Sequence, residues 1–134
     1  MFLHYLNDPQ KRALFYLGHQ MIHADHVVAP AEVCYRDLLI HEAGLGPIPS
    51  VAPNDGEPLL DLFTDRQSCT ALVIELLVLA IIDGAYHPEE AVFAQTVVSY
   101  FGFTDDDQDK INRMAEHIAG TVTGFWDLIQ TPSV

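Results

Sequence analysis

Hydrophobic residues recur along this chain three and four positions apart, in segments separated by residues that end a helix. The first segment, residues 9–25, follows Asn7, a residue type that caps helix N-termini, and it predicts a helix. The second begins at Pro30 and stops at Gly44, where glycine commonly ends a helix. The two segments therefore predict a helical hairpin joined by a short loop.

The stretch 46–63 connects this hairpin to the rest of the chain. Its density of Gly and Pro excludes regular structure over most of its length, and we expect a short helix only in its last five residues. Thr64 or Asp65 can cap the next helix. Residues 71–82 are apolar on almost every side, with Glu75 as the one polar side chain, so they predict a buried central helix.

The last third of the chain predicts three more helices. The first starts at Pro88, ends at Gly102, and carries an apolar face made of Val92, Phe93, Thr96, Val97, Tyr100 and Phe101. Thr104 caps the next, which we expect to stop at Gly120. A final short helix is expected to dock onto the core through Val122, Phe125, Trp126 and Ile129. With no alternating strand pattern, the sequence predicts an all-α fold of about seven helices.

The two halves of the chain share a pattern around their inter-helix loops. Three pairs of matching residues stand 58 positions apart: Asp25 and Asp83, Pro30 and Pro88, Glu32 and Glu90. The chain thus reads as one domain, residues 1–134, built from a duplicated helix-loop-helix unit. Its parts are repeat one (about 8–45), the connector, repeat two (about 64–104) and C-terminal helices (104–130).

Charge narrows the classes of partner. The 134 residues are 49% hydrophobic, enough for a core, and carry 19 acids against 6 bases, a formal net charge of −13. Such a surface repels nucleic acids and anionic membranes, so cations or a basic protein surface are the expected partners. No secretory signal or membrane span is apparent. Cys34 and Cys69 have no metal-type spacing, and we interpret them as reduced, packed thiols of a cytoplasmic protein.

The acidic loops are candidate metal sites. Asp83, Glu89 and Glu90 offer hard oxygen ligands suited to Ca²⁺, Mg²⁺ or Mn²⁺. The alternative for Glu32 and Glu90 is structural, because the third position of a helix favours glutamate. That alternative does not fit Asp25 and Asp83, since an acid at a helix C-terminus faces the negative end of the dipole and needs a positive or donor group opposite it.

Histidines suggest a second possible site. His19, His23 and His26, four and three positions apart, lie on one face running into the first loop and could bind Zn²⁺ or Ni²⁺ with an acid. With seven histidines in the chain, such spacings also arise by coincidence.

Glu75 needs a partner if it is buried. One interpretation places it in a buried network with His19 or His23, and the other places it at a rim covered by Arg12 or Arg66. Nothing in the sequence indicates a nucleophile, and we predict no catalytic residues.

The run Ile82-Asp83-Gly84, then His87-Pro88-Glu89-Glu90, then a helix ending in Phe101-Gly102-Phe103, resembles the TerB-like domain of tellurite-resistance proteins, which also occurs at the N-terminus of a DnaJ-like co-chaperone. The resemblance implies a pseudo-symmetric helical domain without catalytic activity that binds metal and docks partners in stress responses. It places ligands at Asp83 and Glu90 and, by repeat symmetry, at Asp25 and Glu32. His26 and Ala31 depart from the pattern, standing where the second loop has Gly84 and Glu89.

We therefore expect a non-enzymatic, cytoplasmic, acidic binding module with a divalent metal at Asp25, Glu32, Asp83 and Glu90. The secondary candidate ligands are Glu89, Glu75, His19, His23 and His26. Two alternatives stay open. One is a metal-dependent enzyme built on the histidines of the first helix, with Zn²⁺ as a second choice of metal. The other is a metal-free scaffold that recruits a basic protein. The oligomeric state is left open.

Overall fold

The computed structural model describes residues 2–22, 30–44, 59–82 and 88–130, and all regular structure within these ranges is helical. The all-α prediction is confirmed for this part of the chain. Its elements are 3₁₀-helix η1 (Leu3–Tyr5), α1 (Asp8–Ile22), α2 (Pro30–Ala43), 3₁₀-helix η2 (Leu59–Leu62), α3 (Arg66–Ile81), α4 (Pro88–Tyr100) and α5 (Asp105–Gln130).

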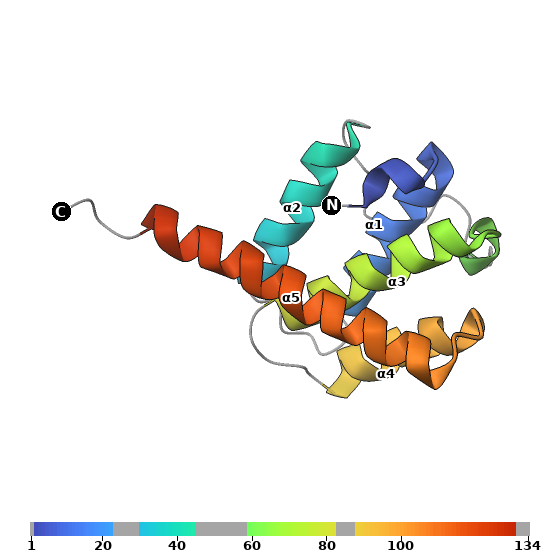
Figure 1. Cartoon of the computed structure of the whole chain (residues 1–134). Helices are drawn as coiled ribbons and strands as arrows, with labels where there is room; N and C mark the ends of the chain where they lie inside the picture. Colours follow the sequence, from blue (N-terminus) through green and yellow to red (C-terminus); the bar gives the residue numbers. More distant parts are fainter. Residues whose placement is uncertain (1, 23–29, 45–58, 83–87, 131–134) are drawn as a thin grey trace.

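Helix α3 is the centre of the fold. It packs against each of the other four α-helices, with α1 and α2 on one side, α4 below and α5 crossing in front (Figure 1). Every side chain from Ala71 to Ala80 is buried, as the continuous apolar run predicts. Asp65 caps this helix by accepting a hydrogen bond from the backbone N–H of Ser68 at 2.9 Å, which lowers the pKa of the Asp65 carboxyl. No helix within the described residues is at once long enough and apolar enough to span a membrane.

Local signals place the helix ends. Asn7 and Gln10 form a capping box before α1, in which each side-chain oxygen accepts from the other's backbone N–H at 2.9 Å. Thr104 Oγ1 accepts from the Asp107 N–H at 3.1 Å and caps α5. Gly44 comes directly after α2 and Gly102 two residues after the end of α4, with φ of 65° and 70°, a conformation that costs glycine little. These ends match the predicted ones.

The prediction of a helix end at Gly120 is wrong. α5 runs without a break from Asp105 to Gln130, so one helix stands where two were expected, and the described residues hold five α-helices and two short 3₁₀-helices. Glycine ends a helix when it adopts positive φ, and Gly120 is not among the described glycines that do so. The hydroxyls of the nearby Thr121 and Thr123 are accommodated within the helix, since each donates to the carbonyl four residues earlier.

The predicted docking of the C-terminus onto the core is correct for two of its four residues, Val122 and Trp126, and wrong for Phe125 and Ile129. The last turns of α5 extend past the rest of the bundle (Figure 1), and the side chains of Phe125 and Ile129 are 60% and 63% exposed. Val122 and Trp126 are half-buried and pack on the edge of the core. Only the part of the apolar stripe up to Ala119 is fully covered.

The predicted apolar face of α4 is rotated from the observed one. In α4, Val92, Thr96 and Tyr100 are exposed, and the buried side chains are Glu90, Ala94, Val97 and Val98. The predicted face did not include Glu90, which the structure places at the start of the buried side. In α2, the buried side chains are Glu32, Tyr35, Leu39 and Ala43.

The interpretation of both cysteines as packed thiols fails for one of them. Cys34 is free and exposed on α2. Cys69 is free and half-buried, with Sγ 3.4 Å from the Phe63 carbonyl oxygen, and burial raises the pKa of its thiol.

Candidate functional site

Two glutamates at equivalent positions enter the core from the first turns of two helices. Glu32 is the third residue of α2 and Glu90 the third of α4, and both are 0% exposed. Glu89, one position earlier in α4, is exposed. Of the acids predicted around the second loop and described in the structure, Glu90 is therefore the one directed inward.

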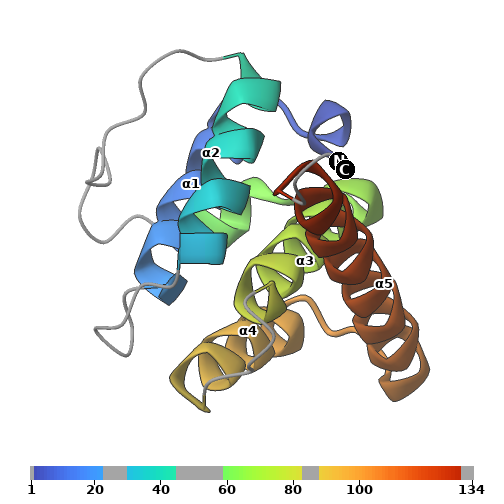
Figure 2. The same cartoon turned by 90° about the vertical axis from the view of Figure 1, so that its left-hand side faces the viewer.

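The helix ends that carry these glutamates lie on the same side of the molecule. Both views show the C-terminal ends of α1 and α3 and the N-terminal ends of α2 and α4 on one side (Figures 1 and 2). α1 contacts both α2 and α4, and α3 contacts α4, so these four helices pack together. We call this end of the bundle the hinge end. His19, half-buried in the last turn of α1, approaches it along that helix.

The burial of these carboxylates requires compensation. Removing an ionised carboxylate from water costs several kcal/mol unless a proton, donor or cation offsets it. The helix N-terminus supplies part of that compensation, about 2 kcal/mol at most in partly buried geometries. The position in the first helical turn thus accounts for the choice of glutamate at these sites. It does not by itself account for complete burial, since a side chain that caps a helix can do so while exposed to solvent.

Several predicted ligands lie outside the described residues: Asp25, Asp83, His23 and His26. Within residues 2–22, 30–44, 59–82 and 88–130, no three His, Cys, Asp or Glu side chains are grouped so that they could hold a metal ion. A metal centre of three such side chains that uses Glu32 or Glu90 would therefore need a ligand from outside the described residues.

Glu75 forms a separate buried contact between the two halves of the chain. It is 0% exposed, and its Oε2 accepts a hydrogen bond from the buried Tyr35 hydroxyl of α2 at 2.9 Å. Its Oε1 accepts from the backbone N–H of Phe2 at 3.4 Å. Burial, together with the smaller effect of the Glu75 charge, raises the pKa of Tyr35 well above its ordinary value.

The prediction that Arg12 or Arg66 covers Glu75 at a rim is wrong. Arg66 instead binds Asp107 at 2.9 Å, lowering the pKa of that carboxyl, and lies 5.3 Å from the ring centre of Phe103. Sequence reasoning missed Tyr35 as a partner of Glu75. The available sequence signal was the position of Tyr35 three residues after Glu32, which puts both side chains on the same face of α2.

Comparison with known proteins places the chain in no family: no family model, no curated sequence and no solved structure matches it. The assignment of a role therefore depends on the geometry of the chain itself.

Proposed function

We propose that this protein is a TerB-like, non-catalytic binding module that holds a divalent cation at the hinge end of the bundle. Glu32 and Glu90 provide carboxylate ligands from the core side, and Asp25 and Asp83 provide them from the loops. The observation that carries the proposal is the matched, complete burial of Glu32 and Glu90 in the first turns of α2 and α4.

Three features support a cation over simple helix capping. The two glutamates occupy the same place in both proposed repeats, 58 residues apart. Each is fully buried, and each follows a segment whose sequence contains another aspartate. Carboxylate oxygens alone favour Ca²⁺, Mg²⁺ or Mn²⁺ over softer ions. Glu75, bonded to Tyr35 and Phe2, has a structural role in this proposal, and exposed Glu89 has none.

Calorimetric titration of metal-stripped protein with Ca²⁺, Mn²⁺ and Zn²⁺ tests the proposal. Asp83→Asn and Glu90→Gln should abolish the heat of Ca²⁺ or Mn²⁺ binding, because each removes one charged ligand with little change of volume. Glu89→Gln is the matched control, since it makes the same chemical change in the same helical turn at an exposed position, and it should bind as the wild type does. Circular dichroism of each variant reports whether the helices are intact.

Other outcomes favour the alternatives. A site for Zn²⁺ that His23→Ala removes and Asp83→Asn leaves intact would support a histidine centre, which the position of His19 near the hinge end also favours. In that case His19, His23, Asp25 and Glu32 or Glu75 become candidates for metal-dependent catalysis. If no ion binds, a metal-free scaffold for a basic protein is the better description. The cytoplasmic location and the link to tellurite or stress resistance are part of the proposal and rest on the resemblance alone.

A further inference from the structure

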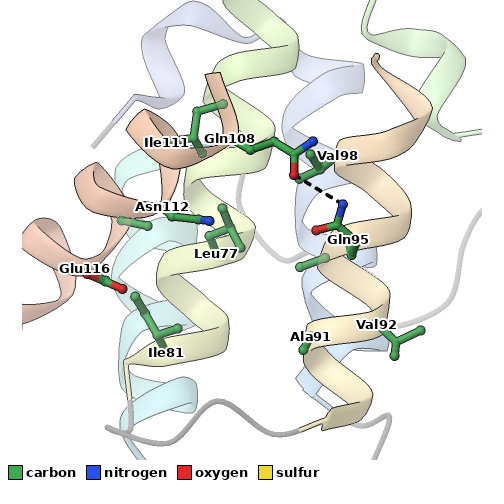
Figure 3. A pocket seen from close by; sticks show the side chains of 12 residues that line it. Leu77, Ile81, Ala91, Val92, Gln95, Val98, Gln108, Ile111, Asn112 and Glu116 are labelled. Carbon is green, nitrogen blue, oxygen red and sulfur yellow. Dashed lines mark hydrogen bonds between the residues drawn. The ribbon is translucent and has the colours of Figure 1, made fainter. Parts of the chain in front are cut away.

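A groove of about 490 Å³ lies between α4 and α5, away from the Tyr35–Glu75 contact, with α3 forming its floor (Figure 3). Leu77 and Ile81 contribute the floor, and small residues keep the walls low: Ala91 and Ala94 on α4, Ala115 on α5. Small side chains on two facing helices leave room for larger apolar side chains from another molecule.

The rim of the groove is polar and closes it at one end. Gln95 of α4 donates from Nε2 to Gln108 Oε1 of α5 at 3.3 Å, bridging the two walls (Figure 3). Asn112 and Glu116 continue the rim along α5, and Val92, 67% exposed, lies on the α4 side. Apolar surface thus extends from the floor of the groove out to solvent.

Among the described residues that line the groove, the charged one is Glu116, and two more acids lie along α5 near it. Asp105, Asp109 and Glu116 are exposed and stand four and seven positions apart, so they lie along the same side of α5 as the rest of the groove rim. We call these three residues the acidic edge. The helix dipole explains an acid in the first turn, such as Asp105, but not Glu116 in the middle of the helix. On α5, Lys110 binds Asp106 at 3.1 Å, and Arg113, which does not line the groove, stands four positions after Asp109 and three before Glu116.

The opposite wall adds no positive charge, since α4 contains no Lys or Arg. An apolar floor with an acidic edge on one side and a neutral edge on the other complements an amphipathic helix whose apolar face is flanked by Lys or Arg. A second copy of this chain is a poor match, because each copy carries a formal charge of −13. The same charge opposes nucleic acids and anionic lipids.

We propose that the groove between α4 and α5 is the docking site for a basic amphipathic helix of a partner protein. The inference rests on the proposed role as a binding module, but Glu32 and Glu90 are not among the described residues that line the groove. Metal binding and peptide binding can therefore fail independently, and the peptide experiment uses EDTA-treated protein.

The probe is a synthetic, fluorescently labelled peptide of about five helical turns, with Leu at helical spacing and Lys along one flank. A second peptide carries Glu at every Lys position. Fluorescence anisotropy at low salt should show binding of the Lys peptide only, and affinity should fall as salt is added. Failure of the Lys peptide to bind, or equal binding of both peptides, would overturn the proposal.

Protein variants then locate the site. Glu116→Lys should weaken binding about five- to tenfold, the range expected for losing one attraction and adding one repulsion at a partly screened surface. Asp37→Lys makes the same charge change at an exposed position on α2, which lines no part of the groove, and should stay within about twofold of wild type. Val92→Ser should weaken binding without changing charge.

Equal losses in the Glu116 and Asp37 variants would mean that net charge alone attracts the peptide, which would refute a defined site. Sedimentation equilibrium tests the other possible occupant of the groove, a second copy of this chain. A wild-type dimer that Glu116→Lys or Val92→Ser dissociates would show that a second copy fills the groove, and the proposal would again be wrong.

Discussion

The contact between Tyr35 and Glu75 allows a quantitative test of the core. Tyr35→Phe keeps the ring and its packing but removes the hydroxyl that donates to Glu75 Oε2 at 2.9 Å. Hydrogen bonds to charged groups contribute about 1.5–3 kcal/mol, and here the acceptor is left buried with one donor fewer. We therefore expect the free energy of unfolding to fall by about 2 kcal/mol, a large share of the roughly 5–15 kcal/mol typical of a domain.

A double-mutant cycle with Glu75→Leu makes the reasoning sharper. Each single variant leaves one buried polar group without its partner, whereas the double variant removes both. The double variant should be more stable than the sum of the single effects predicts, by about 1–2 kcal/mol.

Urea unfolding measured by far-UV circular dichroism compares all four proteins. Tyr5→Phe is the control, because that side chain is about half exposed and its change should be within about 0.5 kcal/mol of zero. Additive effects of the Tyr35 and Glu75 changes, within about 0.5 kcal/mol, would refute the described pairing.

The ionisation of Tyr35 and the two glycines Gly102 and Gly120 allow further tests. The pKa of Tyr35 in the folded chain is raised above its ordinary value of 10.0. The stabilisation is therefore fully present below pH 10. Above pH 10 the free energy of unfolding should decrease, because the unfolded chain releases the Tyr35 proton and the folded chain keeps it. The slope should approach about 1.4 kcal/mol per pH unit, and urea titrations between about pH 9 and 11 should show it reduced in Tyr35→Phe; equal slopes would contradict the assignment. Gly120→Ala should raise the free energy of unfolding by about 0.5–1 kcal/mol, since no atom within 4 Å would meet the new Cβ inside α5. Gly102→Ala should lower it because φ is 70° there, so thermal melts that rank these two variants in the opposite order would show that α5 breaks at Gly120.

The helix ends are well predicted from the sequence because the signals for them are local. Asp65 caps α3 and Gly102 ends α4 through groups within a few residues. Gly120 shows the limit of this reasoning, since the same residue type ends a helix or continues it according to its φ. That angle depends on whether the residues after the glycine extend the helix, which composition alone does not decide.

The burial of charged side chains could not be predicted from the sequence. The complete burial of Glu32 and Glu90 is not predicted from the sequence, because the cost of a buried carboxylate is offset only by groups brought together in the folded chain. For Glu75, a partner was anticipated, but Tyr35 is 40 residues away along the chain. The roles of Asp25, Asp83, His23 and His26 stay predictions, because these residues lie outside the described ones.

The hydrogen bonds of Glu75 bear on how the chain unfolds. A protein built from a duplicated unit, as proposed for this chain, can lose one half while the other persists, as repeat proteins do when neighbouring units are weakly coupled. Here a side chain from the third α-helix accepts hydrogen bonds from the second α-helix and from Phe2 near the start of the chain. Opening the first hairpin alone would break the hydrogen bond from Tyr35, so partial unfolding is penalised and the chain should melt in one cooperative transition.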